Sequence, residues 1–339
     1  MPDLMFFLSH APRLEDLVFE MLLWDDSLEA CIPVKVPSMK LVTFNHSDIS
    51  AIFDILSHII LPNCASVRIH GAHMDGVEWL HQAGTNGPQH TVRFTVEQTT
   101  HLEICMASSS TLFVLAESSS NGLWLELNDH NWEQVADVFC LRNLISFSTI
   151  SSLILKVTFR TQFVSPTFLD SFPELKSLTL HLEYGRRLPF LGAESLVRRV
   201  ASSSAARKSL HSLLIICDMS PECIQQRPLP FTITTELLGE QLKNDFNNAS
   251  ASGDPPLHRF AFEVFKEQLP LPATALHREF LRHMLHLWRD PHASLGRRVE
   301  ELECSESRRA EKAKELTSTR IHEWSPFSEY WASSRGSDT

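Results

Sequence analysis

The sequence predicts an α/β fold in which short parallel strands alternate with helices, and three observations lead to this prediction. An eight-residue pattern recurs, with a proline followed by apolar side chains at the second, fifth and seventh places after it. Three copies begin at Pro12, Pro37 and Pro62, which are 25 residues apart. Apolar residues at helical spacing fill the segment between the second and third copies. A period of roughly 20–29 residues with this pattern is typical of stacked strand–helix repeats.

Each copy of the pattern predicts a strand with one buried face. In the copy that begins at Pro173, Leu178 and Leu180 point to one side of the strand, and Thr179 between them points to the other. Because one unit cannot bury its apolar face alone, we expect neighbouring units to stack into a parallel sheet with helices on one side. The further copies are residues 150–155, which lack the proline, 173–180, 210–215 and 255–262.

The connecting segments predict helices. Apolar side chains in residues 49–60 follow the spacing of an amphipathic helix, and Ser47 or Asp48 is placed to cap it. Residues 75–78 and 131–134 each begin with an N-cap residue three places before an acidic or amide side chain, as a capping box does. Strand, turn and helix therefore follow one another along the chain.

The 25-residue register is lost in the middle of the chain. Three short apolar runs, His101–Met106, Thr111–Ala116 and Leu123–Leu127, are separated by Ser-rich or Asn-Gly segments. Such runs predict β-strands, arranged as hairpins or as substitutes for regular repeats. We therefore expect an irregular, β-rich part at about residues 90–130.

The octet pattern is not found after Phe262. Residues 275–289 carry apolar side chains at near-helical spacing, and residues 297–319 are dense in Glu, Arg and Lys, which predicts a solvated helix. The resulting organisation has three parts. It comprises a repeat solenoid at 1–265 with a flexible loop at about 244–254, a C-terminal helical cap at 266–331, and a disordered tail at 332–339.

Composition narrows the class of partner and the compartment. Of the 339 residues, 30 are basic and 41 acidic, which gives a net charge of −11 and argues against nucleic acid as a partner. The seven cysteines form no CxxC pair, and Cys64 and Cys105 lie within apolar runs, which favours a reducing compartment. No secretory signal pattern opens the chain and no apolar run is long enough to span a membrane. We expect an intracellular protein, cytoplasmic or nuclear.

Sequence motifs give little support to catalysis. The chain contains no GxSxG, GxxxxGK[ST], GxGxxG or HExxH pattern, so no catalytic residue and no cofactor is predicted. His283 and His286 are i, i+3 neighbours on an expected helix, but metal binding would need further ligands from other elements. An enzyme with an unrecognised site between residues 90 and 145 is the alternative from another functional class.

The octets and their preceding helices resemble the leucine-rich-repeat region of F-box proteins, particularly the divergent sets of mushroom-forming fungi. The resemblance rests on Phe6–Leu17 and Phe168–Leu178, each a short helix, a proline and a strand, and it covers about residues 1–265. It implies an irregular leucine-rich-repeat solenoid that binds proteins. No F-box is recognisable, so docking of the ubiquitin-ligase adaptor Skp1 and a cullin would require an F-box upstream. The conserved turn asparagine of the repeat is replaced by other residues, among them Ser47.

The side chains that alternate with the buried ones predict a partner-binding surface on the sheet. They mix charged, hydroxyl and apolar groups, which suits a protein ligand. The leading hypothesis is a non-enzymatic interaction module, by resemblance the substrate-recognition part of an F-box ubiquitin-ligase subunit. The alternative is a free-standing repeat scaffold or inhibitor unrelated to ubiquitin. The predicted partner-binding residues are Asp16, Thr43, Arg68, Ser177, Thr179, His181, Arg259 and Glu263.

Overall fold

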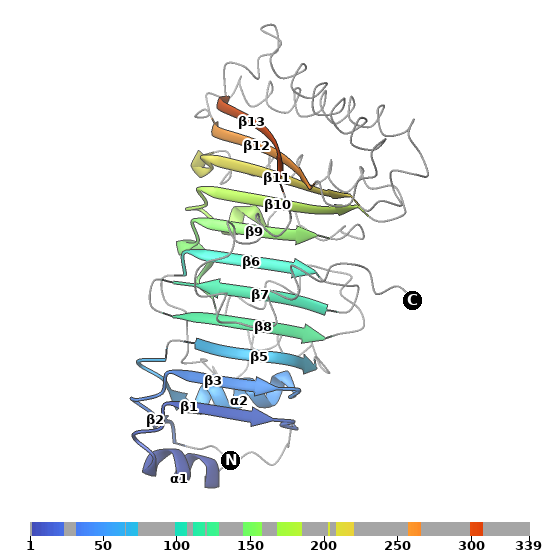
Figure 1. Ribbon diagram of the computed structural model, residues 1–339. Helices are drawn as coiled ribbons and strands as arrows, with labels where there is room; N and C mark the ends of the chain where they lie inside the picture. Colours follow the sequence, from blue (N-terminus) through green and yellow to red (C-terminus); the bar gives the residue numbers. More distant parts are fainter. Residues whose placement is uncertain are drawn as a thin grey trace, which may run out of the picture. The chain divides into compact units, whose positions relative to one another are not determined.

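A computed structural model of the chain confirms the α/β class, with a large, mostly parallel sheet and few helices in the described part (Figure 1). The chain divides into two compact units. The first comprises Met1–Leu155 and Gln162–Leu175, and the second comprises Lys156–Thr161 and Lys176–Thr339. The structure describes residues 2–23, 32–64, 66–73, 99–106, 111–118, 121–128, 145–157, 168–184, 203, 208–219, 257–265 and 299–307.

The first unit is built on a sheet with strand order β1-β3-β5-β8-β7-β6-β9. These strands are β1 (Asp16–Glu20), β3 (Leu41–Asn45), β5 (Ser66–His73), β6 (His101–Met106), β7 (Thr111–Glu117), β8 (Gly122–Asn128) and β9 (Ser152–Val157), the last of which begins in this unit. The remaining elements are α1 (Pro2–His10), α2 (Ile49–His58), the two-stranded sheet of β2 (Val34–Lys35) and β4 (Ile59–Ile60), and the 3₁₀ turns η2 (Phe147–Thr149) and η3 (Leu169–Ser171).

The 25-residue period of the sequence appears directly in the strand register. Asp16 pairs with Leu41 and Leu41 pairs with Ser66, in parallel strands. Each strand follows a β-turn with proline at its second position, where the fixed φ of proline is favourable. The turn hydrogen bonds run from the amide of the fourth residue to the carbonyl of the first: Leu14 to Ala11, Met39 to Val36, Cys64 to Leu61 and Leu175 to Phe172.

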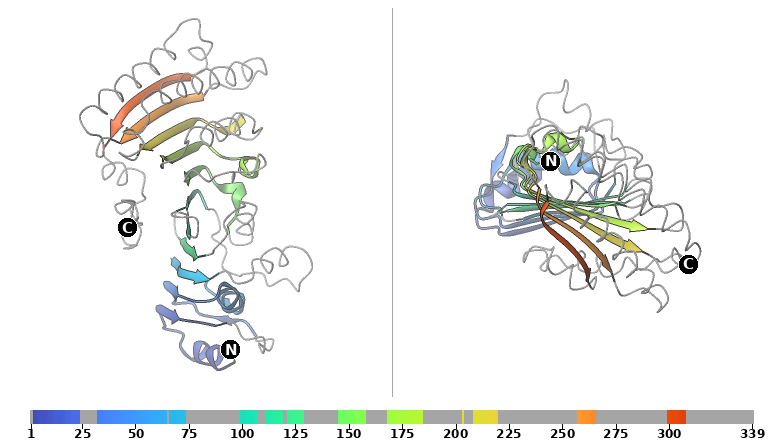
Figure 2. Two further views of the ribbon diagram at one scale, coloured as in Figure 1. Left: turned by 90° about the vertical axis from the view of Figure 1, so that its right-hand side faces the viewer. Right: turned by 90° about the horizontal axis from the view of Figure 1, so that it is seen from above.

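Burial explains the apolar positions of the octet. Helix α2 lies on one side of β1, β3 and β5 (Figure 2), and the side chains of Val42 and Phe44 point to the buried side of β3. Phe44 stacks on Phe19 of the preceding repeat, with ring centroids 4.9 Å apart. Burying such a side chain stabilises the fold by about 1.5–3 kcal/mol. The repeats therefore depend on one another for their core.

The three apolar runs in the middle of the chain form β6, β7 and β8, and the prediction of hairpins is confirmed. The pairs β6–β7 and β7–β8 are antiparallel, and β8 continues the sheet by pairing in parallel with β5. These strands are buried on both faces, as the burial of Leu102, Glu103 and Ile104 shows. The continuous apolar sequence of strands such as β7 reflects this two-sided burial.

The described part of the second unit contains four parallel strands in the order β10-β11-β12-β13. Three of them, β10 (Ser177–Tyr184), β11 (Ser212–Met219) and β12 (Leu257–Phe265), coincide with predicted copies of the octet. The fourth strand, β13 (Val299–Ser307), pairs with β12, so the helix predicted over 297–319 is wrong where the structure describes it. The dense charge indicated a helix, but Val299, Leu302 and Cys304 are the apolar residues of a strand that extends the sheet.

Several sequence predictions lie outside the described residues. They include the helices expected after residues 75 and 131, the loop at 244–254, the helix at 275–289 and the tail at 332–339. Cys64 and Cys105 are buried, as expected, and neither is in a disulfide among the described residues. Burial raises the pKa of the Cys64 thiol to about 11, so this thiol stays protonated at neutral pH. Within the described part, no helix is long and apolar enough to cross a membrane.

Candidate partner-binding face

One surface of the first unit is formed by side chains of three successive repeats, and we call it the N-terminal face. Each of β1, β3 and β5 contributes three alternate residues, which line up in rows because the strands are in register. Neighbouring strands are about 4.8 Å apart, so β1 and β5 are about 10 Å apart across this face. The rows are Asp16, Leu41 and Ser66; Val18, Thr43 and Arg68; and Glu20, Asn45 and His70.

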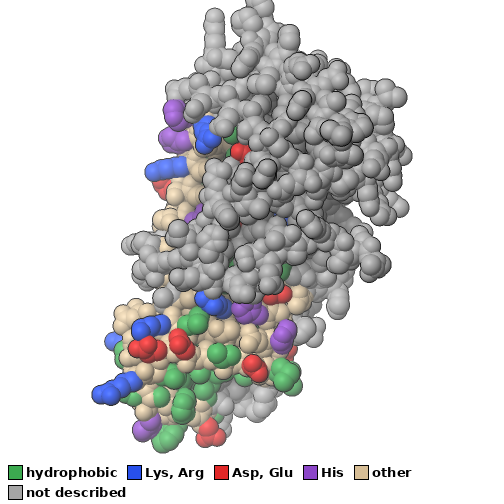
Figure 3. All heavy atoms as spheres, viewed as in Figure 1, with side chains coloured by type: hydrophobic (Ala, Val, Ile, Leu, Met, Phe, Trp, Pro, Cys, Tyr) green, Lys and Arg blue, Asp and Glu red, His purple; other side chains and the backbone are tan. Residues whose placement is uncertain are grey.

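The N-terminal face is accessible, and its charge changes from one strand to the next. Strand β1 presents the exposed carboxylates Asp16 and Glu20 on either side of Val18, which is 57% exposed. The β3 residues of the face are neutral and half-buried, and β5 adds the half-buried Arg68 and His70. Figure 3 shows hydrophobic, acidic and basic side chains mixed over the part of the surface formed by α1, β1 and β3. Such a mixture suits a protein partner better than a small apolar ligand.

The far boundary of the N-terminal face is aromatic and acidic. Strand β8 pairs with β5 there, and Arg68 is in register with Trp124. The buried Trp124 ring lies 6.1 Å from the imidazole of His70 and 5.8 Å from the ring of Phe113, between centroids. The Glu126 carboxylate lies 3.7 Å from Nδ1 of His70. Packing against these groups holds His70 at one end of the face.

The turns that follow the strands repeat the 25-residue period in their backbone. Met21, His46 and Gly71 occupy equivalent places, and all three have positive φ, of 52°, 47° and 60°. The amides of Met21 and His46 donate to carbonyls of the next repeat, at Asn45 and His70. A left-handed residue thus directly follows β1 and β3, whereas Gly71 lies within β5, where the pairing with β8 shifts its register.

The hydroxyl of Ser47 bonds to backbone groups of two successive repeats. This hydroxyl is fully buried, accepts a hydrogen bond from the Leu22 amide of the preceding repeat at 3.0 Å, and donates to the Asn45 carbonyl at 2.9 Å. The neighbouring Asp48 makes no side-chain capping bond to α2. Ser47 therefore links two repeats, and neither expected residue caps α2 through its side chain.

At the start of the strands, Lys40 and Glu15 join two repeats on the surface. The ammonium of Lys40 lies 2.6 Å from the Glu15 carboxylate, and both side chains are more than half exposed. The hydrogen bond and charge of Glu15 raise the pKa of Lys40. Since the pair is exposed and screened by solvent, it contributes to register more than to stability.

The predicted partner-binding residues fall into two groups. Asp16 and Arg259 are exposed, and Thr43, Arg68 and Ser177 are half-buried. Thr179, His181 and Glu263 are buried, with exposed fractions of 5%, 0% and 5%, so the prediction that they lie on an exposed face is wrong. Strand β10 is buried on both faces from Leu178 to His181, and the octet alone cannot reveal this. In the first unit, Asp16, Thr43 and Arg68 lie together on the N-terminal face.

A polar chain that the sequence motifs did not reveal connects β6 with β9. Nδ1 of His101 lies 3.0 Å from Oγ of Ser152, and Nε2 lies 2.8 Å from Oε1 of the buried Glu103. Desolvation lowers the pKa of His101, but the hydrogen bond to Glu103 and the charges of Glu103 and Glu117 outweigh it and raise that pKa. Burial raises the pKa of Glu103. In the sequence, this hydrogen-bonded series is indicated only by the polar residues His101 and Glu103 within the apolar run His101–Met106.

The Ser152–His101–Glu103 chain has the residue types of a nucleophile, a base and an acid. Its backbone surroundings differ from those of a hydrolase. The amides of Ser151 and Ser152 both donate to the Thr100 carbonyl, so they are not free to stabilise an oxyanion. A similar pair of hydrogen bonds occurs at the start of β3, where the amides of Lys40 and Leu41 both donate to the Glu15 carbonyl. We interpret the hydrogen bonds among Ser152, His101 and Glu103 as a polar link that fixes β9 against β6.

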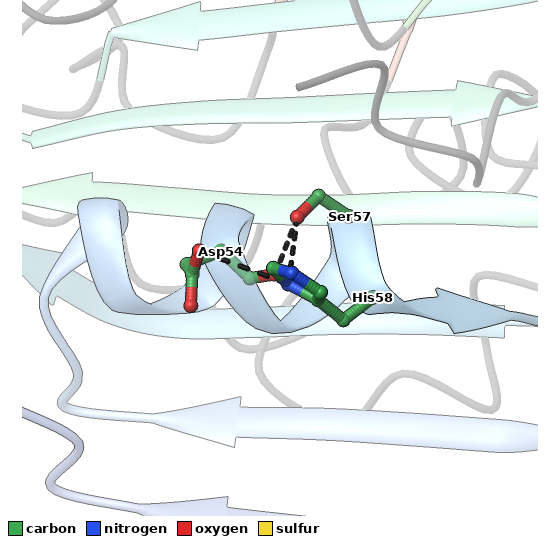
Figure 4. A network of polar contacts seen from close by, with 3 residues as sticks. All are labelled: Asp54, Ser57 and His58. Carbon is green, nitrogen blue, oxygen red and sulfur yellow. Dashed lines mark hydrogen bonds and ion pairs between the residues drawn. The ribbon is translucent and has the colours of Figure 1, made fainter. Parts of the chain in front are cut away.

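Two helix ends carry another serine–histidine pair, which is also structural. At the end of α2, Ser57 donates to the Asp54 carbonyl at 2.7 Å, and Nδ1 of His58 lies 2.8 Å from the same oxygen and 3.8 Å from the Asp54 carboxylate (Figure 4). Ser9 and His10 make the same contacts to the Phe6 carbonyl in α1. All of these contacts are local, and they satisfy carbonyl groups that a helix end leaves unpaired.

The described residues contain no group of three or more His, Cys, Asp or Glu side chains placed to hold a metal ion. The polar clusters described above are structural links between strands or at helix ends. No protein-family model matches the chain, and neither the curated proteins nor the solved structures contain a match.

Proposed function

We propose that the chain is a non-enzymatic protein-interaction module, built as an irregular leucine-rich-repeat solenoid, that binds a partner through the N-terminal face. The observation that carries this proposal is the register of β1, β3 and β5. It presents three residues from each of three repeats on one accessible surface. Solenoids use extended faces of this kind to bind other proteins.

The chemistry of the N-terminal face supports a protein partner. A partner that crosses the strands from β1 to β5 meets acidic groups first, then Thr43 and Asn45, and then basic groups. Electrostatic complementarity of this kind sets the orientation of a partner and its rate of association. The exposed Val18 supplies an apolar contact at the acidic end.

The resemblance to F-box proteins gives the proposal its more specific form. In that form the module holds a substrate for a ubiquitin ligase and performs no chemistry itself. A free-standing repeat scaffold or inhibitor is the alternative, and it uses the same face without the ligase.

Affinity purification of the full-length chain from its source organism tests both levels of the proposal. The variant Asp16→Lys/Thr43→Lys places two cations on the N-terminal face, and Lys35→Glu changes the charge of an exposed residue outside it. We expect partner proteins that co-purify with the wild type and with Lys35→Glu, and that are lost from the face variant. Partners retained by the face variant would contradict the use of this face.

The same purification separates the ligase from the scaffold. Recovery of a cullin and its adaptor with the wild-type chain would support the F-box form. Recovery of face-dependent partners without a cullin would support the scaffold alternative.

A further inference from the structure

Strand β1 forms the outer edge of the sheet among the described strands, and its only strand partner there is β3. The backbone of Glu15 and of Met21 bonds towards β3, since the Glu15 carbonyl accepts from Lys40 and Leu41 and the Met21 amide donates to Asn45. Backbone groups alternate between the two edges of a strand. The amides and carbonyls of Asp16, Val18 and Glu20 therefore point to the outer edge.

The side chains of the same three residues form an acidic–apolar–acidic row. All three are exposed. Within the described part of the chain, Asp16 and Glu20 have no ion-pair partner, whereas the adjacent Glu15 is paired with Lys40. Two further exposed apolar side chains, Met21 and Leu23, with exposed fractions of 71% and 78%, follow the strand directly. The edge thus offers backbone hydrogen bonds, two negative charges and an apolar surface together.

A second copy of the chain fits this edge poorly. An antiparallel pair of β1 strands centred on Val18 would place Asp16 opposite Glu20 of the other copy, and Glu20 opposite its Asp16. Like charges directly opposite one another destabilise a strand pair. The carboxylates therefore discourage pairing with itself and favour a strand of opposite charge.

We propose that β1 binds an extended segment of a partner protein as an added strand, and that this segment has a basic, any, apolar, any, basic pattern. The partner backbone pairs with the outward amides and carbonyls of Asp16, Val18 and Glu20. Its two cations lie opposite the two carboxylates, and its apolar residue packs on Val18. Such strand addition derives affinity from the main chain and specificity from alternate side chains. The inference deepens the proposed function, since it names one class of partner, but it uses the edge of β1 and not the whole face.

Peptide binding to the full-length chain tests the inference. The probe is a fluorescent nine-residue peptide with lysine at positions three and seven, valine at position five and threonine elsewhere, measured by fluorescence anisotropy. We expect Asp16→Asn/Glu20→Gln to weaken binding by about 2- to 30-fold, as the loss of two cross-strand charge pairs predicts. The matched control Glu15→Gln removes an acid that is already paired, and it should leave the affinity within about twofold.

Two modified peptides test the backbone contacts and the charge pattern separately. N-methylation of the alternate amides that face β1 should abolish binding, while N-methylation of the other alternate set should not. A peptide with glutamate in place of both lysines should not bind. Because all three substituted residues are exposed, circular dichroism should show the wild-type fold in each variant.

Four results would overturn the inference. They are no binding of the lysine peptide, equal binding of the glutamate peptide, equal loss with either N-methylated set, and a dimer through β1 that excludes the peptide. None of them bears on face-dependent partners in the purification, so failure of this inference can be told apart from failure of the proposed function.

Discussion

Strands β1, β3 and β5 and strands β6, β7 and β8 belong to the same unit, but they meet solvent differently. The first three are parallel, 25 residues apart, and buried on one face. The other three are joined as antiparallel hairpins and buried on both faces. Polar side chains of the regular repeats are therefore available to a partner, whereas those of the hairpin strands must be satisfied inside the protein, as Glu103 is by His101. Among these six strands, those that keep the 25-residue period are the ones that have an accessible face.

The largest expected effect comes from breaking the core that the regular repeats share. Phe44 is fully buried and stacks on Phe19, so Phe44→Ala should cost about 3–5 kcal/mol of unfolding free energy. Thr43→Ala on the neighbouring face position should cost about 0.5 kcal/mol or less. Urea denaturation measures both. Equal losses would show that the two sides of β3 are not different.

The third repeat depends on a glycine where the first two do not. Gly71 has φ +60°, and a Cβ atom there would lie 2.8 Å from Nδ1 of His46. The left-handed backbone alone costs an alanine about 1–2 kcal/mol, and the contact with His46 adds to this. Gly71→Ala should therefore destabilise the fold by more in the wild type than in a His46→Ala background, when the denaturation midpoints are compared as a double-mutant cycle. An identical cost in both backgrounds would mean that the close contact is absent.

The link between the first two repeats depends on one hydroxyl. Ser47→Ala removes the buried hydroxyl that accepts the hydrogen bond of the Leu22 amide, and we expect a loss of about 1–3 kcal/mol in unfolding free energy. Ser9→Ala removes a similar bond at an exposed helix end and should cost about 0.5 kcal/mol or less. Hydrogen exchange should also be faster at the Leu22 amide in Ser47→Ala. Unchanged exchange there would contradict the link.

The hairpin region should make stability depend on pH. The pKa values of His101 and Glu103 are both raised in the folded protein, so the native state binds more protons than the unfolded state above pH 6.5 for His101 and above pH 4.5 for Glu103. Their contribution is present below those values and is lost as the pH rises through the raised ones. We expect the urea midpoint to fall between pH 6 and pH 8.5.

A double variant isolates this titration. In His101→Gln/Glu103→Gln neither group titrates, so the slope between pH 6 and pH 8.5 should be smaller than in the wild type. Ser9→Ala, at an exposed helix end, removes no group that titrates in this range and should keep the wild-type slope. A double variant with an unchanged slope would assign the pH dependence to other groups.

Local patterns predicted most of the strands correctly because local physics determines them. Proline fixes φ in the turn before β1, β3, β5 and β10, and the apolar residues that follow have one side to bury. Strand β13 was missed since its glutamates resemble a solvated helix, and its assignment depends on pairing with β12. Pairing of this kind is a tertiary effect that propensity does not contain.

The candidate site was predicted only in part for a similar reason. Thr43 and Thr179 stand at the same place of the octet, six residues after Pro37 and Pro173, and only the first lies on an accessible face. What surrounds each strand depends on the rest of the chain. The sequence separates only some of the hairpin strands from the regular ones: Thr111–Ala116 loses the alternation of a strand with one buried face, whereas His101–Met106 keeps polar residues between its apolar ones.

This pair of threonines gives the most direct test of the account. Thr43→Cys and Thr179→Cys introduce the same thiol at equivalent places of two repeats, and mass spectrometry of the labelled peptide reads each site apart from the seven native cysteines. We predict that iodoacetamide labels position 43 of the folded protein about tenfold or more faster than position 179, and that both react alike in denaturant. Equal labelling of the folded protein would contradict the claim that Thr43 lies on an accessible face whereas the equivalent position of β10 is buried.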